Sequence, residues 1–319
     1  MIKTQHFFTI AIPAYKRLYL KEAIDSVMSQ TYTNFELVIV DDASPEDLFS
    51  VVSQYDDDRI RYYKNDVNIG AVNVVDNWNR CLEYSKGDYI ICMGDDDRLL
   101  PCCLEELVKL MDKYPGLGVY HAWTELIDEN TRFKSLQEPR PEWESALSMV
   151  WNRWSWRFKQ YIGDFCFDTS LLRKEGGFYK LPLAWGSDDI TAVRAAMTKG
   201  IANTSRLCFQ YRVNSQTITN TGSLSLKLQA GSMEKQWYEE FIAIMSEKKT
   251  LSYSDERYLS LISEGINRHF YEKDRSEIIT EFTNHKSQLL KISAYGRSMG
   301  YSMVKLLYWW LVALKKRQS

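Results

Sequence analysis

The alternation of short apolar segments with longer segments of helical period, along residues 7–212, limits what this chain can fold into more than any other feature. Residues 7–13 (FFTIAIP) and 35–40 (FELVIV) are almost wholly apolar, as are strands buried on both faces of a sheet. In residues 20–28, apolar side chains recur at steps of three and four and predict a helix with one apolar face. The alternation predicts an α/β fold in which helices cover both faces of a mainly parallel sheet.

The same pattern predicts the other elements of this region. Further strands are expected at residues 60–63, 89–93, 118–124 and 207–212, and further helices at residues 70–85, 102–113 and 188–199. Ser44 is predicted to be the N-cap of another helix, with Pro45 at its first position. Residues 128–165 break the pattern and are rich in Trp, Arg and Pro. They predict either a loop-rich wall for an acceptor or an amphipathic helix with aromatic side chains on its core side.

The composition changes after about residue 222, where the chain becomes charged and keeps a helical period. The predicted division is a domain of residues 1–222 and a helical extension of residues 223–319. In the extension, residues 303–314 (MVKLLYWWLVAL) are apolar apart from one lysine and precede three basic residues. A membrane-spanning helix needs about 20 apolar residues. The segment therefore predicts either a helix docked on the core or an interfacial helix, with about residues 300–319 contacting lipid through its tryptophans and basic end.

Charge and cysteine content narrow the choice of partners and compartment. The 319 residues carry a formal net charge of −2, which gives no general attraction to nucleic acid. The six cysteines show no C-x-x-C spacing and several lie in apolar segments, as expected for free thiols in a reducing compartment. The first eight residues lack the basic start and apolar run of a secretion signal, so a cytoplasmic location is predicted.

Acidic residues gather at the ends of two predicted strands. Asp41 and Asp42 follow the second strand, and Asp95, Asp96 and Asp97 follow the fourth. In a sheet of this kind, ligands bind at the carboxyl ends of the strands. Three adjacent carboxylates repel one another, so a positive group is expected close by. Either acidic cluster alone also fits a solvated turn.

Five segments, in their order and spacing, resemble those of a large enzyme family. They are FTIAIPAYKR at 8–17, SQTYTNFELVIVDDAS at 29–44, NIGAVNVVDNWNRCLEYSKGDYI at 68–90, GDDDRLLP at 94–101 and WGSDDITAVRAAMTKG at 185–200. Together they resemble family 2 of the inverting glycosyltransferases, which act in bacterial cell-surface polysaccharide biosynthesis. The resemblance implies the GT-A fold, a Rossmann-like α/β arrangement. It also implies transfer of a sugar from a nucleotide-sugar to a hydroxyl of a glycan or lipid-linked glycan.

The resemblance implies a set of donor-binding residues. Pro13, Ala14 and Tyr15 would line the nucleotide pocket, and Asp42 would accept a hydrogen bond from the base. The N3–H of uracil is a natural donor to such a carboxylate, so a UDP-sugar is the expected donor. Asn79 would contact the donor from the helix beside the nucleotide crevice.

The resemblance also implies a metal site after the fourth predicted strand. Residues 94–97 stand where the family has its D-x-D motif, although the first position, commonly acidic, is Gly94 here. Asp95 would contact the ribose, Asp96 would bind Mg²⁺ or Mn²⁺, and Asp97 would support the metal. A divalent cation neutralises the charge that develops on a departing nucleoside diphosphate.

Asp188 would act as the general base. Its spacing to Arg194 matches the family's motif, whereas the preceding position, often Glu in the family, is Ser187. Asp189 is therefore the candidate for a supporting carboxylate. A carboxylate at the start of a helix is stabilised as the anion. The alternative is that Asp188 only caps its helix.

Three other functions share part of these features. A nucleotidyltransferase of this architecture would carry a Gly-rich phosphate loop after its first strand, and residues 12–15 (IPAY) are not one. A glycoside hydrolase needs two acids but no nucleotide pocket. A non-catalytic carbohydrate- or nucleotide-binding protein with this fold would be expected to have lost one of the acidic residues. The predicted function is therefore glycosyl transfer in the cytoplasm, with peripheral contact to the inner membrane face where a lipid-linked acceptor would lie.

Overall fold

The computed structural model describes residues 6–214, 223–284, 293–294, 296–297 and 300–315. These residues form two compact units. The first contains residues 6–180 and 187–214, and the second contains residues 181–186 together with the described residues from 223 onward. The predicted division at residue 222 lies outside the described residues.

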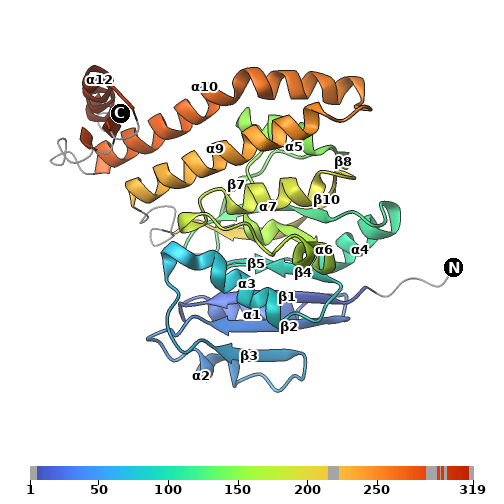
Figure 1. The fold of residues 1–319 in the computed structure, drawn as a ribbon. Helices are drawn as coiled ribbons and strands as arrows, with labels where there is room; N and C mark the ends of the chain where they lie inside the picture. Colours follow the sequence, from blue (N-terminus) through green and yellow to red (C-terminus); the bar gives the residue numbers. More distant parts are fainter. Residues whose placement is uncertain (1–5, 215–222, 285–292, 295, 298–299, 316–319) are drawn as a thin grey trace. The chain divides into compact units, whose positions relative to one another are not determined.

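The first unit is built on one sheet (Figure 1). Its strands are β1 (Phe8–Ala14), β2 (Phe35–Asp41), β3 (Ile60–Lys64), β4 (Tyr89–Cys92), β5 (Arg98–Leu99), β6 (Val119–Ile127), β7 (Phe133–Leu136), β8 (Trp143–Glu144), β9 (Phe165–Asp168) and β10 (Ile201–Arg212). Their order is β3-β2-β1-β4-β9-β6-β10-β5, with β7 paired to β6 and β8 to β10. The pairs β1–β2, β1–β4, β2–β3 and β6–β10 are parallel and hold most of the paired residues. The predicted mainly parallel α/β sheet is confirmed.

Helices lie on both faces of this sheet. They are α1 (Leu20–Met28), α2 (Phe49–Val52), α3 (Val74–Tyr84), α4 (Cys103–Lys113), α5 (Ala146–Trp154), α6 (Thr169–Lys174) and α7 (Ser187–Ala196), with the 3-10 turns η1 (Ala71–Asn73) and η2 (Ile162–Asp164). Buried residues of α1, α2 and α4 belong to one core cluster with the sheet. By contrast, α3 packs against β1 and β2 and contributes nothing to that cluster, so it covers the opposite face.

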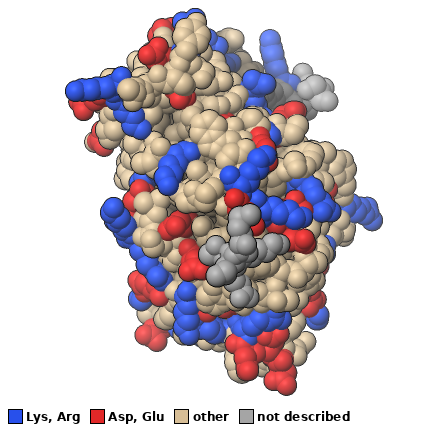
Figure 2. Space-filling view, turned by 90° about the vertical axis from the view of Figure 1, so that its right-hand side faces the viewer, with Lys and Arg blue, Asp and Glu red and all other residues tan. Residues whose placement is uncertain are grey.

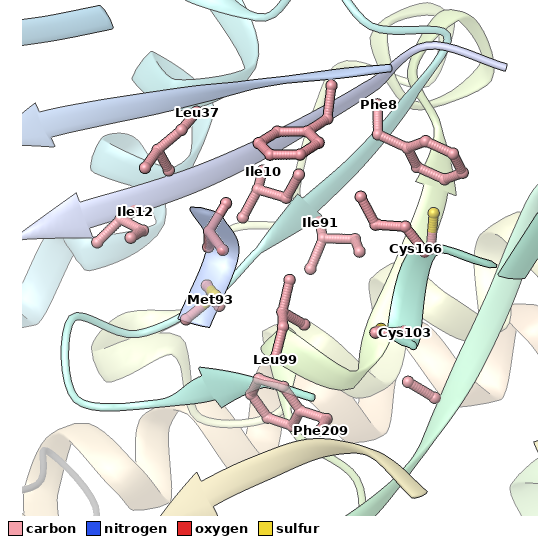
Figure 3. Packing of buried hydrophobic residues seen from close by; sticks show 14 of the residues in the cluster. Phe8, Ile10, Ile12, Leu37, Ile91, Met93, Leu99, Cys103, Cys166 and Phe209 are labelled. Carbon is pink, nitrogen blue, oxygen red and sulfur yellow. The ribbon is translucent and has the colours of Figure 1, made fainter. Parts of the chain in front are cut away.

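The larger core fills the face covered by α1 and α4 (Figure 3). Ile10 and Ile12 of β1 point into it beside Leu37 of β2, because alternate residues of a strand share a face. Cys103 and Cys166 lie in the same cluster, and all six cysteines are free thiols. The prediction that thiols pack here as small apolar groups is confirmed.

One predicted helix begins later than expected. Ser44 is not an N-cap: its Oγ donates to the Tyr15 carbonyl oxygen (2.6 Å) and accepts from the Glu46 amide (3.0 Å). The helix α2 begins only at Phe49 and has no side-chain cap. The prediction is wrong because local capping competes with other main-chain partners, and here the hydroxyl bonds the chain that leaves β1.

Residues 128–165 combine the two predicted alternatives. They form the short strands β7 and β8 and the helix α5, whose N-cap Ser145 accepts a hydrogen bond from the Ser148 amide. Trp154, at the end of α5, is buried on the core side, whereas Trp156 is 63% exposed. The prediction of an amphipathic helix with core-facing aromatic residues therefore holds for α5 alone.

Gly87, just before β4, approaches the backbone of β1 too closely for a side chain. A methyl group on Gly87 would lie 2.4 Å from the Thr9 nitrogen and 2.7 Å from the Phe8 carbonyl carbon. Because overpacking costs about 1–3 kcal/mol, Gly87→Ala is expected to lower the free energy of unfolding, measured in urea, by about that amount. Gly265 is the matched control: a methyl group there meets nothing within 4 Å, so Gly265→Ala should stabilise its helix by about 1 kcal/mol. Equal effects of both variants would contradict this packing.

The described part of the second unit consists of helices. They are α9 (Leu224–Ser246), α10 (Tyr253–Asn284) and α12 (Met303–Lys315), with the 3-10 turn η3 (Pro182–Ala184). Ion pairs Lys227–Glu277 and Lys273–Glu234 join α9 to α10. The helical period predicted for this region of the chain is thus found.

The helix α12 packs within its own unit through one face. Leu306, Trp309 and Ala313 are buried in that unit's core. The prediction of a docked helix is confirmed, and the prediction that both tryptophans lie at lipid headgroups is wrong for Trp309, because it is enclosed by protein. In the described chain, no helix has the length and apolar character needed to cross a membrane.

Charged side chains of both signs are mixed on the face shown in Figure 2. Lys and Arg lie among Asp and Glu there, in keeping with the net charge of −2. Attraction of a polyanion over long range needs a concentrated basic surface. The face in Figure 2 does not present such a surface.

Candidate active site

The strands of the first unit bring several chain segments to the same edge of the sheet. The strands β1, β2 and β4 are parallel, and β6 runs with β4 because both are antiparallel to β9. The strand β10 is parallel to β6. The chain passes from β2 on one side of β1 to β4 on its other side, and a ligand crevice is expected where strand order reverses in this way. Residues that follow β1, β2, β4 and β10 are therefore the candidates.

Residues 14–16, where the chain leaves β1, lie between the two acidic clusters. On one side, the Asp42 amide donates to the Ala14 carbonyl oxygen (2.9 Å). On the other side, Asp95 Oδ2 accepts hydrogen bonds from the amides of Tyr15 and Lys16, both at 2.7 Å. The structure thus places Asp42 and Asp95 on either side of one short segment.

The carboxylate of Asp42 holds the loop before η1. Its Oδ1 accepts from Asn65 Nδ2 (2.9 Å) and the Ile69 amide (2.8 Å), and its Oδ2 accepts from Asn68 Nδ2 and the Gly70 amide, both at 3.1 Å. A carboxylate offers about four acceptor positions, and these four bonds use them. Direct recognition of a base by Asp42 therefore requires one of these bonds to be exchanged.

The three acids after β4 are each held differently. Asp95 accepts the two amide hydrogen bonds described above. Asp96 Oδ2 accepts from Asn214 Nδ2 (2.6 Å), and Asp97 Oδ1 accepts from the Arg212 amide (2.9 Å). Burial raises the pKa of all three carboxyls, that of Asp95 to about 6. The neighbouring Asp96 carboxylate raises the pKa of Asp95 and Asp97 further. A cation that binds to this cluster can therefore displace protons from its carboxyl groups.

Arg212, the last residue of β10, is the positive group that three adjacent carboxylates require. Its side chain is fully buried, and its Nε donates to the Asp96 carbonyl oxygen (2.8 Å). Its Nη2 pairs with Glu22 (2.9 Å), and the Tyr19 ring covers the guanidinium, 4.1 Å from centroid to Cζ. Arg212 thus fixes the backbone of the acidic cluster and counters the charge of Asp96.

The residues present fit a divalent cation. Asp96 Oδ1 and Asp97 Oδ2 converge over Gly94, since a methyl group on Gly94 would lie 2.8 Å and 3.0 Å from them. Glycine at this position, where the family commonly has an acid, leaves that space open. Mg²⁺ is usually held by one or two carboxylates together with substrate phosphates. In the described chain no three His, Cys, Asp or Glu side chains are grouped to hold a metal by themselves.

Asp188 lies in the first turn of α7, next to Asp189. The rings of Tyr161 and Tyr211 stack with centroids 3.7 Å apart. Burial, and then nearby carboxylates that include both Asp97 and Asp188, raises the pKa of each phenol. One predicted metal residue and the predicted base therefore both act on the pKa of the same aromatic pair.

The carboxyl of Asp188 has an unusual affinity for protons. Burial raises its pKa to about 8, and the adjacent Asp189 adds repulsion that Arg153 partly offsets. A carboxylate with a pKa near the working pH is suited to general-base catalysis. The helix α7 begins at Ser187, so Asp188 lies inside its first turn and is not the N-cap that the structural alternative required.

The other predicted donor-binding residues differ in what they contact. Pro13 and Ala14 are the last residues of β1, and Tyr15 follows with an exposed ring. Asn79 on α3 pairs with the main chain of Phe178: its Oδ1 accepts from the amide (2.8 Å) and its Nδ2 donates to the carbonyl (3.3 Å). Both polar side-chain atoms of Asn79 therefore bond the main chain, and its contact with the nucleotide-sugar stays a prediction.

Sequence reasoning missed several residues at this edge. Arg212 ends a predicted strand and Asn214 follows it two residues later, so the rule that selected the acidic residues would have found them. Tyr161 and Arg153 lie in residues 128–165, where no period indicates which face a side chain takes. No local signal in the sequence predicts their place in the site.

Comparison with known proteins agrees with this fold. The family model described as Glycosyl transferase family 2 matches residues 9–178, more than half of the chain. The putative colanic acid biosynthesis glycosyl transferase WcaA of Escherichia coli (strain K12) is 30% identical over 187 residues, which cover 53% of this chain and 63% of that protein. The GalNAc(5)-diNAcBac-PP-undecaprenol beta-1,3-glucosyltransferase of Campylobacter jejuni is 34% identical over 104 residues, 32% of this chain and 33% of that one. The chain thus matches less than two thirds of these relatives' length.

Two solved structures share the fold. The S. aureus TarS 1–349 complex with UDP-GlcNAc has a TM-score of 0.64 at 15% identity and covers 90% of this chain and 79% of that one. The mannosyltransferase PcManGT from Pyrobaculum calidifontis, in complex with GDP-Man and Mn²⁺, has a TM-score of 0.51 at 16% identity and covers 98% and 86%. The fold and the acidic edge therefore define a protein of the GT-A class. The chain belongs to glycosyl transferase family 2, because the family model covers more than half of its length.

Proposed function

We propose that the protein is an inverting, metal-dependent glycosyltransferase that moves a hexosyl group from a UDP-sugar to a hydroxyl of a glycan or lipid-linked glycan. The observation that carries the proposal is that the acids after β4 and the acidic start of α7 both raise the pKa of Tyr211, which stacks on Tyr161. Family membership supports glycosyl transfer. The TarS complex with UDP-GlcNAc supports the donor class, and the name of the Campylobacter relative supports a lipid-linked acceptor. The biological setting would be assembly of a bacterial cell-surface polysaccharide.

Each acidic residue has a separate task in this proposal. Asp95 contacts the ribose, and Asp96 with Asp97 holds Mg²⁺ or Mn²⁺. When bound, the cation supplies neutralisation of the charge that develops on the departing diphosphate. Asp42 recognises uracil by exchanging one of its four hydrogen bonds, while residues 13–15 line the pocket. The alternative of a non-catalytic binding protein is not favoured, because Asp42, Asp96 and Asp188 are all present.

Asp188 performs the proton transfer. Its carboxylate accepts the proton of the acceptor hydroxyl while that oxygen attacks the anomeric carbon from the face opposite the diphosphate. The new glycosidic C–O bond forms as the C–O bond to UDP breaks, so the anomeric configuration inverts. The protonated Asp188 then releases its proton to solvent.

The raised pKa of Asp188 predicts how the transfer rate depends on pH. Below its pKa of about 8 the carboxyl is mainly protonated and cannot accept a proton, and above that value it is the anion. At saturating donor, the rate is therefore expected to rise about tenfold per pH unit below neutrality and to level off above the pKa. A pH–rate profile measures this. A rate that is flat or falls across the same range would show that Asp188 is not the base.

A panel of nucleotide-sugars tests the donor directly. UDP-sugars are expected to raise the melting temperature in the presence of Mn²⁺, because a ligand that binds only the folded state stabilises it. GDP-sugars serve as the matched comparison. Stabilisation by GDP-sugars alone would overturn the uracil assignment, and stabilisation by no nucleotide-sugar would overturn the proposed function.

We also propose that the protein lies in the cytoplasm and binds the inner membrane face through α12. Val304, Leu307, Tyr308 and Leu311 are exposed and recur at helical spacing, and Lys315 ends the helix. An apolar helix face with a basic end is suited to the surface of an anionic bilayer. The acceptor would then be reached at the membrane surface.

A double variant tests this membrane contact. Leu307→Asp with Leu311→Asp is expected to lower the fraction of protein that sediments with phosphatidylglycerol vesicles by about tenfold or more, because two apolar side chains lose their burial in lipid. Ile244→Asp is the control, since Ile244 is an equally exposed apolar residue on α9. Equal binding by the double variant and the control would contradict the role of α12.

A further inference from the structure

Asp188 and Asp189 are adjacent carboxylates in the first turn of α7, and they accept hydrogen bonds from different donors. Asp189 is buried, and Arg153 Nε donates to both of its oxygens, at 3.0 Å to Oδ1 and 3.2 Å to Oδ2. Gln160 Nε2 donates a further hydrogen bond to Oδ1. By contrast, Asp188 Oδ1 accepts from the Asp189 amide (3.0 Å). The side-chain oxygens of Asp189 thus accept three hydrogen bonds from Arg153 and Gln160.

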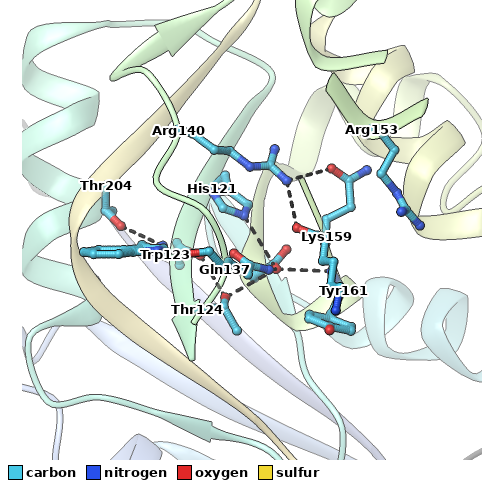
Figure 4. Close-up of polar contacts among 12 residues, drawn as sticks. His121, Trp123, Thr124, Gln137, Arg140, Arg153, Lys159, Tyr161 and Thr204 are labelled. Atoms are coloured by element: carbon cyan, nitrogen blue, oxygen red, sulfur yellow. Dashed lines mark hydrogen bonds and ion pairs between the residues drawn. The ribbon is translucent and has the colours of Figure 1, made fainter. Parts of the chain in front are cut away.

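A buried arginine sets the orientation of Gln160. Arg140 Nη2 donates to Gln160 Oε1 (2.9 Å) and to the Lys159 carbonyl oxygen (3.0 Å), as Figure 4 shows. An amide whose oxygen accepts from arginine must present its NH₂ group on the other side. Gln160 therefore offers a donor to Asp189.

The segment that carries Gln160 is anchored at its other end as well. Asp164 Oδ2 accepts from the Tyr161 amide (3.1 Å) and from Gln137 Nε2 (2.8 Å), and it lies 3.5 Å from His121 Nε2 (Figure 4). Asp164 is fully buried. Residues 160–164 are therefore held at both ends, and so is the Gln160 amide group that donates to Asp189.

The charges near Asp188 come from four elements. On α7 itself there is Asp189, on η2 there is Asp164, and both raise the pKa of Asp188. Arg153 of α5 acts in the opposite direction. Asp188 and Asp97 both raise the pKa of the Tyr161 and Tyr211 phenols. Arg153 is the cation among these groups, and it is bonded to the residue next to the base.

We propose that Arg153 is a positioning residue for the general base: it holds Asp189 in place, fixes the first turn of α7 and supplies the positive charge that lets Asp188 ionise. The inference rests on the proposed role of Asp188. It gives Asp189 a structural role beside Asp188, which performs the proton transfer. Without Arg153, the negative charge of Asp189 next to Asp188 would lose its partner.

The test is the pH–rate profile of Arg153→Gln. Its midpoint is expected to move by about one unit or more to higher pH, so that the rate falls about tenfold near neutrality and recovers at alkaline pH. Arg153→Lys keeps the charge and should restore the midpoint. Arg157→Gln is the matched control on the same stretch of chain, because Arg157 is exposed and donates to Asn152 Oδ1 (3.4 Å). The Kd of UDP with Mn²⁺ should be unchanged in all three variants.

The possible results separate this inference from the proposed function. A loss of rate by the same factor at every pH, or no change, would overturn the role of Arg153 while leaving Asp188 as the base. A fully active Asp188→Asn enzyme would overturn the proposed function itself. If Arg153→Gln does not fold, Gln160→Leu removes the other donor to Asp189 and is expected to shift the midpoint in the same direction. An unshifted midpoint in Gln160→Leu would then overturn the inference.

Discussion

Asp188→Asn is expected to lower the rate of sugar transfer by about 10²–10⁴-fold, because an amide cannot accept the proton of the acceptor hydroxyl. The change keeps the shape of the side chain, and the amide oxygen can still accept the Asp189 N–H that Asp188 Oδ1 accepts in the structure. The Kd of UDP in the presence of Mn²⁺ should therefore stay the same. Steady-state kcat with saturating donor and acceptor, together with calorimetric titration of UDP, measures both quantities.

The matched control for this variant is Asp76→Asn. Asp76 also lies in the first turn of a helix, α3, but it is exposed and pairs with Lys180 at the surface. Exposed ion pairs of this kind contribute about 0–1 kcal/mol, so the rate should stay within about twofold of the wild type. An Asp188→Asn enzyme that transfers sugar as fast as Asp76→Asn would remove the basis for the mechanism.

Asp96→Asn is expected to abolish the metal dependence of donor binding. The substitution removes one of the two carboxylates that converge over Gly94, and a neutral amide is a much weaker ligand for a hard cation. We expect the affinity gained from Mn²⁺ to be lost and the rate to fall by about 100-fold or more. Titrations of UDP with and without Mn²⁺ measure this without relying on activity.

Asp25→Asn is the control for the metal experiment. Asp25 lies on α1 in an exposed pair with Lys21 and accepts a hydrogen bond from Tyr55. This variant should keep the full difference between titrations with and without Mn²⁺. If Asp96→Asn keeps it as well, the cation is held elsewhere and the assignment of the acidic cluster is wrong.

The sheet could be predicted because its signals are local. Strands buried on both faces, such as β1 and β2, are continuous apolar runs, and the helices between them carry an apolar face of their own. Ser44 shows the limit of this reasoning. Its sequence context is that of an N-cap, but a distant main-chain oxygen, that of Tyr15, takes its hydroxyl instead.

The candidate site could be predicted only in part, for the same reason. The acids after β2 and β4 are recognisable because strand ends define an edge before any contact is known. The hydrogen bonds that Asp42 accepts from residues 65–70 could not be predicted, since they depend on the path of a loop. Arg153 reaches Asp189 across 36 positions of sequence from a segment without a clear period. Contacts of this kind follow from the fold and not from local pattern.

The helix α12 illustrates how two interpretations of one segment can each apply to one face. An apolar run of this length fits a docked helix and an interfacial helix equally well from sequence. The structure buries Trp309 and leaves Leu307 and Leu311 exposed. Packing in its own unit accounts for the apolar residues of the buried face, and the membrane proposal rests on those of the exposed face.

A crystal soaked with UDP and Mn²⁺, with the anomalous signal of manganese recorded, would show which carboxylates bind the cation. We expect a manganese peak within coordination distance of the Asp96 or Asp97 carboxylate, with the diphosphate bound to it and its free end directed toward Asp188. A nucleotide bound away from the edge formed by β1 and β4, or a manganese ion that contacts neither carboxylate, would contradict this expectation.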